Sequence, residues 1–135
     1  MEQIKQEMPN LNWYDTLQKS KLTPPNYIFS VAWSLLYIMI FSSFFIYLFS
    51  KNRKDNIGLI LFTIQLIFNL SWAPVFFKLK NPKISLVVII ILWVLILLTL
   101  SYFHKVSPLA SYLLIPYFIW VVFATYLNFF IVVNN

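Results

Sequence analysis

Residues 84–103, with the sequence ISLVVIIILWVLILLTLSYF, decide the fold of this chain. They contain no acidic or basic side chain. As an α-helix rising about 1.5 Å per residue they would be about 30 Å long, the thickness of the hydrocarbon core of a membrane. Their side chains do not alternate between apolar and polar, as those of a barrel strand do. The stretch therefore predicts a membrane-spanning helix.

Three other runs are similarly apolar, at residues 27–49, 57–77 and 109–133. Short polar segments separate the runs, and none of the four acidic residues lies inside one. A helix satisfies its backbone hydrogen bonds internally, as hydrocarbon demands. We therefore expect an all-α fold, a polytopic transmembrane helix bundle with about four spans, in a single domain over residues 1–135.

The composition points to lipid as the solvent of this protein. Hydrophobic residues make up 61% of the chain and charged residues 10%, against about a quarter in soluble domains. So few polar side chains cannot cover a water-soluble globule. The basic residues behind the net charge of +6 lie at the edges of the apolar runs, where they reach lipid headgroups. We expect membrane lipid as a partner and no nucleic acid.

The distribution of basic residues also predicts an orientation. The side that carries both termini has six of them and the other side has four, so the positive-inside rule places both termini in the cytoplasm. The two sets are Lys5, Lys19, Lys21, Lys78, Lys80 and Lys83, and Lys51, Arg53, Lys54 and Lys105.

The sequence excludes several kinds of chemistry. It has no cysteine and one histidine, His104, at the end of the third run. One imidazole makes no metal site, and no carboxylate lies near it in the sequence to complete a hydrolase triad. The spans also lack the acidic or basic side chain that ion-coupled transporters use. We expect no metal and no resident cofactor, and a small transporter is disfavoured.

Neutral amides among aromatic rings are the most informative polar residues of the spans. Gln65, Asn69, Trp72 and Phe76 follow one another at i, i+4, i+7 and i+11, so they share one helix face. Each amide needs a hydrogen-bond partner in apolar surroundings. Either the amides hold helices together, or they line a cavity and bind a ligand with Trp72 as a wall. The sequence leaves both interpretations open.

Aromatic faces recur in the first and fourth runs. An aromatic stripe is usually packing, but Trp33, Trp72 and Trp120 lie inside the spans rather than at the interface, which favours pocket walls. Pro74 and Pro116 each remove a backbone donor. Proline is common in membrane helices, so a simple kink is the favoured interpretation, although a kink also splays helices apart and makes room for a pocket. The two further faces consist of Trp33 and Tyr37, and of Tyr117, Trp120, Ala124 and Asn128.

Four segments in order along the chain resemble the motifs of one family. They are WYDTLQK at 13–19 followed by Pro24-Pro25, WSLLY at 33–37, QLIFNLSWAPVFF at 65–77 and PYFIWVVFATYLN at 116–128. The TspO/translocator (TspO/MBR) family of tryptophan-rich proteins has W-Y-x-x-L-x-K before a double proline, W-T-x-L-Y, Q-L-x-x-N-x-x-W-x-P-x-F-F and P-Y-x-x-W-x-x-F-A-T-x-L-N. From Trp13 to Asn128, the chain resembles this family.

The resemblance implies a five-helix bundle, commonly dimeric, that binds porphyrins such as protoporphyrin IX or haem and, in some members, sterols. Flat aromatic walls suit a macrocycle, and Asn69 would offer a directional amide. Lys19 or Lys21 would pair with porphyrin propionates. By motif position, the ligand-binding residues would be Tyr14, Pro24, Trp33, Tyr37, Asn69, Trp72, Phe76, Trp120 and Ala124.

Some bacterial members are reported to break down porphyrins in light. By that resemblance Trp33 and Trp120 are the redox-active candidates, and no residue is assigned as catalytic beyond them. The resemblance and the charge distribution together predict the cytoplasmic (inner) membrane of a bacterium as the location.

The chain departs from the family pattern in three places. The family's first helix precedes the Trp13-Tyr14 loop, whereas here the mostly polar residues 1–12 do, so we expect a bundle without that helix or a misplaced start. No basic residue follows Leu127-Asn128, so we expect no sterol motif there. Ser20 replaces a usual proline and Ile40 a frequent glycine, which predicts a looser loop and altered packing.

Two functions from different classes follow. The leading expectation is a membrane-embedded protein that binds porphyrin-like planar ligands, as a receptor with a sensor, transport or degradation role in porphyrin metabolism. The alternative is a structural or interaction protein of the membrane, a shortened family member with no working ligand pocket. The second predicts a fixed partner and no stabilisation by a porphyrin.

Overall fold

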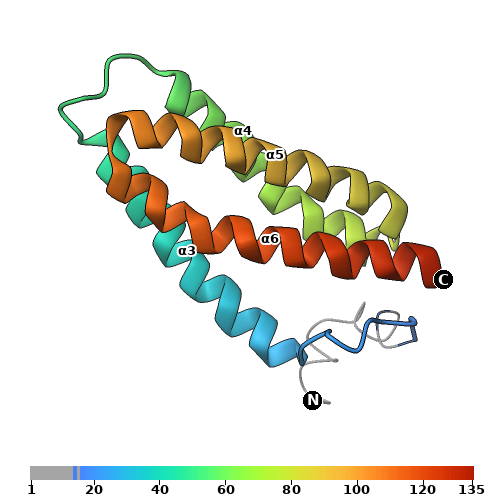
Figure 1. Cartoon of the computed structure of the whole chain (residues 1–135). Helices are drawn as coiled ribbons and strands as arrows, with labels where there is room; N and C mark the ends of the chain where they lie inside the picture. Colours follow the sequence, from blue (N-terminus) through green and yellow to red (C-terminus); the bar gives the residue numbers. More distant parts are fainter. Residues whose placement is uncertain (1–13, 15) are drawn as a thin grey trace.

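The computed structural model describes residue 14 and residues 16–135, and it is all-helical over these residues (Figure 1). The expectations for residues 1–12, Trp13 and Asp15 lie outside this part of the chain. Within these described residues, four helices are long and apolar enough to cross a membrane, one of them being α4 continued by η1, so the prediction of about four spans is confirmed. The elements are α3 (Asn26–Leu48), α4 (Ile57–Ala73), the π-helix η1 (Pro74–Lys78), α5 (Pro82–Val106) and α6 (Pro108–Asn134).

The last two helices begin slightly before their apolar runs because their starts are capped. The Asn81 side chain accepts a hydrogen bond from the Ile84 backbone N–H at 3.1 Å, and the Ser107 hydroxyl accepts one from Ala110 at 3.4 Å. Proline follows each cap, where its missing N–H costs nothing and its fixed φ suits the helix. α5 therefore starts at Pro82 and α6 at Pro108.

Pro74 changes the second span from an α-helix to a π-helix. The backbone N–H of Leu79 bonds to the carbonyl of Pro74 at 3.2 Å, five residues back, which is the π-helical pattern. The wider turn places Phe76 in the interior, where it is 2% exposed. Pro116, in contrast, lies inside α6 without ending it. The proline at the end of α4 thus shapes the position of the aromatic rings that follow it.

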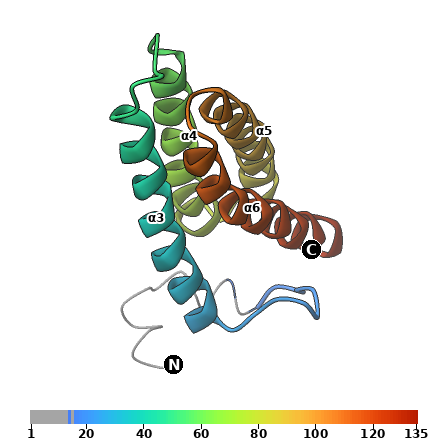
Figure 2. The ribbon, with the colours of Figure 1, turned by 60° about the vertical axis from the view of Figure 1, so that its left-hand side comes forward.

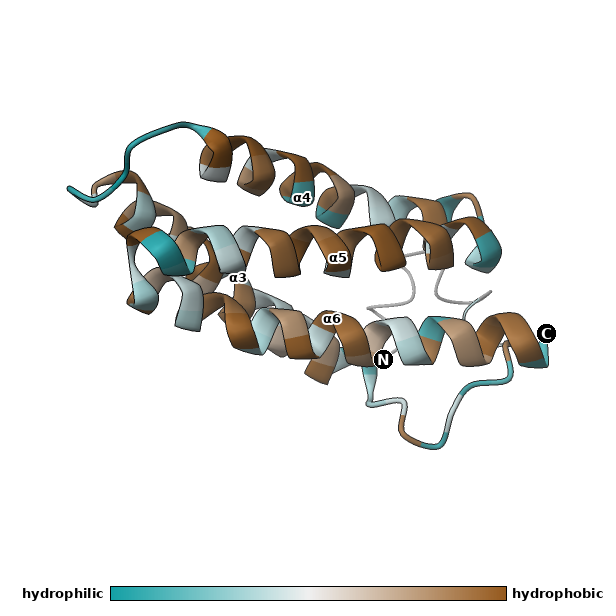
Figure 3. Ribbon diagram, turned by 45° about the horizontal axis from the view of Figure 1, so that its top comes forward, coloured by the Kyte–Doolittle hydropathy of each residue, from teal (hydrophilic) through white to brown (hydrophobic). Residues whose placement is uncertain are grey.

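The helices are arranged around α5 and α6. α5 packs against α4 and α6, and α3 packs on α6 (Figure 2). The first half of α3 diverges from α6, and residues 16–25 run beside the carboxyl end of α6 (Figure 1). Outward-facing surfaces are apolar on every helix, whereas hydrophilic residues gather in the connections and at helix ends (Figure 3). This distribution is that of a bundle surrounded by lipid.

The interior at the end distant from residues 16–25 is closely packed. Tyr47 of α3 stacks on Phe103 of α5 with ring centroids 4.1 Å apart and planes 4° from parallel. Gly58, the chain's single glycine, lies directly against the Tyr47 ring. Ile40, which stands in place of a frequent family glycine, is fully buried in this core.

Gly58→Ala is expected to destabilise the protein by about 1–3 kcal/mol through overpacking. A Cβ at this position would overlap the Tyr47 ring, which is 0% exposed and stacked on Phe103, and so has little room to move. The clash outweighs the gain of up to about 1 kcal/mol from alanine's helix propensity. Thermal unfolding in detergent measures the effect. In a Tyr47→Leu background the penalty should largely disappear, and an undiminished penalty there would contradict the explanation.

Candidate functional site

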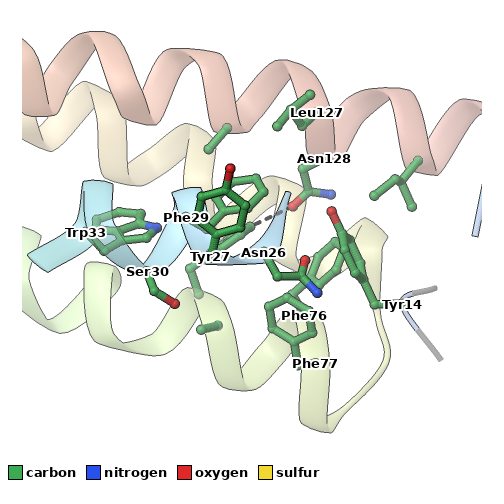
Figure 4. Close-up of a pocket in the computed structure, with 14 residues that line it drawn as sticks. Tyr14, Asn26, Tyr27, Phe29, Ser30, Trp33, Phe76, Phe77, Leu127 and Asn128 are labelled. Atoms are coloured by element: carbon green, nitrogen blue, oxygen red, sulfur yellow. Dashed lines mark hydrogen bonds between the residues drawn. The ribbon is translucent and has the colours of Figure 1, made fainter. Parts of the chain in front are cut away.

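A cavity of about 290 Å³ lies where α3, α4 with η1, and α6 diverge. It is close to the lower end of the roughly 300–1,000 Å³ range of ligand pockets. Figure 4 shows Trp33 and Phe29 of α3 at one end of the cavity and Tyr14, Phe76 and Phe77 at the other. Among the described residues that line it, none is charged. We call this space the aromatic cavity.

Five of the nine predicted ligand-binding residues line the aromatic cavity. They come from three helices and the residues before α3, and they are Tyr14, Trp33, Trp72, Phe76 and Ala124. That they bind a ligand stays a prediction. The remaining four, Pro24, Tyr37, Asn69 and Trp120, are not among its lining residues.

The aromatic rings of the cavity support one another mostly at inclined angles. Trp72 and Phe76 have centroids 5.5 Å apart, and Tyr14 meets Phe76 edge-on at 6.0 Å. Trp33 meets Trp120 at 6.5 Å with planes at 89°. Edge-to-face pairs of this kind stabilise by about 0.5–1.5 kcal/mol each beyond burial. Trp120 is thus placed behind Trp33, one ring removed from the cavity.

A chain of hydrogen bonds joins α3, α4 and α6 deeper in the bundle. The Tyr37 hydroxyl donates to Asn69 Oδ1, and Asn69 Nδ2 donates to the Tyr117 hydroxyl at 2.7 Å. The Tyr117 hydroxyl donates in turn to Gln65 Oε1 at 2.8 Å. Of the two interpretations that the sequence left open, this geometry is that of amides holding helices together. The side-chain carbonyl and one N–H of Asn69 are thus hydrogen-bonded to neighbouring helices.

Asn128 is a cavity residue that the predicted site did not contain. Its Oδ1 accepts hydrogen bonds from Trp72 Nε1 at 3.0 Å and from the Ser85 hydroxyl at 2.9 Å, and its Nδ2 donates to the Pro82 carbonyl at 2.9 Å. One side chain of α6 therefore fixes the orientation of the Trp72 ring and ties it to the start of α5. The sequence places Asn128 on the same helix face as Tyr117 and Ala124, and this position could have predicted that it lines the site.

Other lining residues missed by the sequence lie in the first turns of α3. Tyr27, Phe29 and Ser30 face the cavity because this half of the helix diverges from α6 (Figures 1 and 4). The spacing of apolar and polar residues near the start of α3 does not distinguish these three from residues that face lipid. Tyr27 and Ser30 are exposed as well as lining, so the cavity opens at this edge.

Residues 16–25 are fastened to the end of α6. The Gln18 backbone and the Asn135 side chain exchange two hydrogen bonds of 3.0 Å, and the hydroxyls of Ser20 and Tyr126 share one of 3.1 Å. Ser20 is buried. The hydroxyl of Ser20 therefore provides one of the ties, and the expectation that serine in place of proline loosens this segment stays a prediction.

The described part of the chain contains no candidate metal site. Residue 14 and residues 16–135 hold no group of three or more metal-binding side chains. His104 is exposed near the end of α5, beside the Tyr112 ring at 5.9 Å and at the opposite end of the bundle from the aromatic cavity.

Comparison with known proteins identifies one family. The sequence profile described as TspO/MBR family matches residues 2–133. Protein CrtK of Rhodobacter capsulatus is 40% identical over 67 residues, which cover 48% of this chain and 42% of the relative. The tryptophan-rich protein TspO of Chlorobaculum tepidum is 42% identical over 67 residues, with the same coverage of 48% and 42%. The human translocator protein is 36% identical over 70 residues, covering 50% of this chain and 41% of the relative. The alignments thus span less than half the length of each relative.

Proposed function

Because the chain belongs to the TspO/MBR family, we propose that this integral membrane protein binds a porphyrin-type ligand in the aromatic cavity. The family resemblance supplies the ligand class. The observation that carries the proposal is the aromatic wall of Trp33, Trp72 and Phe76 in a cavity whose described lining residues are all uncharged. Large aromatic faces with few polar groups are the lining that a flat, apolar macrocycle requires.

The open edge of the cavity suits a ligand that is larger than the enclosed space. One edge of a macrocycle would lie between Trp33 and Trp72, and the rest would extend past the exposed Ser30. A ligand that partitions into lipid reaches such an opening from the bilayer. From the family resemblance we also propose a sensor, transport or degradation role in porphyrin metabolism and a homodimeric state. The resemblance and the distribution of basic residues support the cytoplasmic membrane of a bacterium as the location.

Tryptophan fluorescence tests the assignment. Titration of the purified protein with protoporphyrin IX is expected to give saturable quenching, since Trp33 and Trp72 line the cavity and Trp120 contacts Trp33. In the double variant Trp33→Phe/Trp120→Phe the quenching amplitude should fall and Kd should rise about fivefold, because smaller rings stack less well.

Trp93→Phe is the matched control. Trp93 lies on α5 against Phe118, 6.2 Å away, and is not among the lining residues. Its replacement should leave Kd unchanged. Absence of saturable quenching, or quenching that is the same in the double variant as in the wild type, means that the cavity is not the porphyrin site.

The alternative function is that of a structural or interaction protein. The ties between helices made by Asn69 and Asn128 would serve it equally well. It predicts a fixed membrane partner on purification and no change in thermal stability with protoporphyrin IX. The aromatic cavity favours the binding function, because a purely structural bundle gains stability by filling such a space.

The Trp33–Trp120 pair is also the feature on which porphyrin breakdown would depend. The rings are in contact and, of the two, Trp33 lines the cavity. An electron taken from Trp33 by a photo-excited porphyrin would pass to dissolved oxygen, and Trp120 would replace it, so that oxygen is reduced and Trp120 is left oxidised by one electron. Illumination of the complex in air should then bleach the porphyrin absorbance more slowly in Trp120→Phe than in Trp93→Phe. Equal bleaching rates in the two variants would contradict a degradation role for this pair, but would not contradict porphyrin binding.

A further inference from the structure

The aromatic cavity opens toward the lipid between α3 and α4. α3 packs on α6 and α4 packs on α5, whereas the backbones of α3 and α4 remain apart. On the two sides of this gap, Ser30 of α3 and Ala73 of α4 both line the cavity and are exposed. Close to them in the sequence, Val31 and Leu70 are apolar and more than half exposed. The cavity is therefore continuous with the lipid-facing surface of the bundle.

The cavity runs along the first turns of α3. Asn26 begins the helix and lines the cavity near one end, and Trp33, seven residues later, lines the other end (Figure 4). At a rise of about 1.5 Å per residue, the two positions are about 10 Å apart along the helix axis. Because Asn26 follows the polar segment before the span, the cavity extends from the edge of the hydrocarbon core inward. Lipid acyl chains run in the same direction.

The inner part of the cavity offers water few hydrogen-bonding partners among the described residues. Asn128 Oδ1 already accepts hydrogen bonds from Trp72 Nε1 and the Ser85 hydroxyl, and Asn128 Nδ2 donates to the Pro82 carbonyl. An ordered water needs about two to four polar partners. An empty apolar space, in turn, deprives the side chains around it of contacts. In a bilayer, hydrocarbon is therefore the filling that this cavity favours.

We propose that, when no other ligand is bound, the aromatic cavity holds a segment of a lipid acyl chain that enters between Ser30 and Ala73. This segment differs from the lipid around the outer helix faces, because it lies inside the bundle against Trp33 and Trp72. Its occupancy does not require that the protein bind a porphyrin. Any larger ligand of the cavity binds by displacing the segment, so its affinity in a bilayer is set against that of the chain.

Brominated lipid detects such a chain, because bromine quenches tryptophan fluorescence on contact. The full chain is reconstituted without porphyrin into phosphatidylcholine vesicles whose acyl chains are either unbrominated or brominated near their middle. The measured quantity is the fraction of tryptophan emission that is quenched by the brominated lipid.

Two variants fill the opening from opposite sides, and a third is their control. Ser30→Phe acts from α3 and Ala73→Phe from α4, and neither adds a tryptophan. Both positions are exposed, so the substitutions should leave the fold intact. Ser34→Phe places the same ring one turn further along α3, at an exposed position that is not among the lining residues.

Both filling variants are expected to recover emission in brominated vesicles, up to about two fifths of the total, because two of the chain's five tryptophans, Trp33 and Trp72, line the cavity. Ser34→Phe should be quenched as strongly as the wild type. Unchanged quenching in either filling variant would overturn the proposal, since the chain would then not enter through this opening. Equal recovery in Ser34→Phe would overturn it as well, because the added ring would then only screen Trp33 from lipid outside the bundle. Since no porphyrin is present, either result leaves the proposed function to its own test.

Discussion

Ser30→Trp is expected to weaken the binding of protoporphyrin IX by about tenfold or more. Ser30 lines the aromatic cavity at its open edge and is exposed, so an indole there would occupy the space that the macrocycle needs without disturbing the buried core. The porphyrin's own absorbance should be followed in the titration, because the added tryptophan would complicate protein fluorescence.

Ser34→Trp is the control for this substitution. Ser34 is one turn further along α3, is also exposed, and is not among the cavity-lining residues. Its hydroxyl bonds to the Ser30 carbonyl at 2.8 Å, so it also shares the local backbone environment. An added indole at this position should leave Kd within about twofold of the wild type. Equal weakening by the two variants would show that the indole acts on α3 as a whole and not on the cavity.

Asn128→Leu is expected to cost about 3–5 kcal/mol of stability and to weaken porphyrin binding. The substitution removes three hydrogen bonds that join α6 to Trp72, Ser85 and Pro82. Interhelical hydrogen bonds in membranes average about 0.6 kcal/mol, and a buried donor left without a partner costs about 1–3 kcal/mol more. The Trp72 ring would also lose the bond that fixes its orientation in the cavity wall.

Asn134→Leu provides the comparison for Asn128→Leu. Asn134 is exposed near the end of the same helix, and its Nδ2 bonds within α6 to the Phe130 carbonyl at 2.8 Å. This change should alter stability by less than about 0.5 kcal/mol. Unfolding in a denaturing detergent series measures both variants. Similar losses for the two would mean that the Asn128 hydrogen bonds contribute nothing specific.

The span pattern was readable from the sequence because it depends on local properties alone. Apolar runs such as residues 84–103 are long enough to cross the bilayer wherever the other helices lie. The earlier starts of α5 and α6 could also have been predicted from the sequence, since Asn81-Pro82 and Ser107-Pro108 are helix-start signals. The prediction of a kink at Pro74 gave no indication that the helix would continue as a π-helix.

The site was harder to predict because it depends on which faces meet. Helix periodicity placed Gln65 and Asn69 on one face. Only the position of Tyr117 on α6 shows that both amides bond to its hydroxyl and do not line the cavity. The cavity residues Tyr27 and Ser30 depend on the divergence of α3, which no local pattern encodes. The fastening of residues 16–25 to the end of α6 is likewise a contact between distant parts of the chain, which no local pattern encodes.

The thermal unfolding temperature with and without protoporphyrin IX, in the wild type and in Ser30→Trp, tests the central claim most directly. A ligand that binds only the folded state stabilises it by about 2.7 kcal/mol at a concentration of 100 times Kd. Porphyrin binding in the aromatic cavity predicts a clear rise for the wild type and a much smaller one for Ser30→Trp at the same concentration. No rise in the wild type, or an equal rise in both proteins, would contradict it.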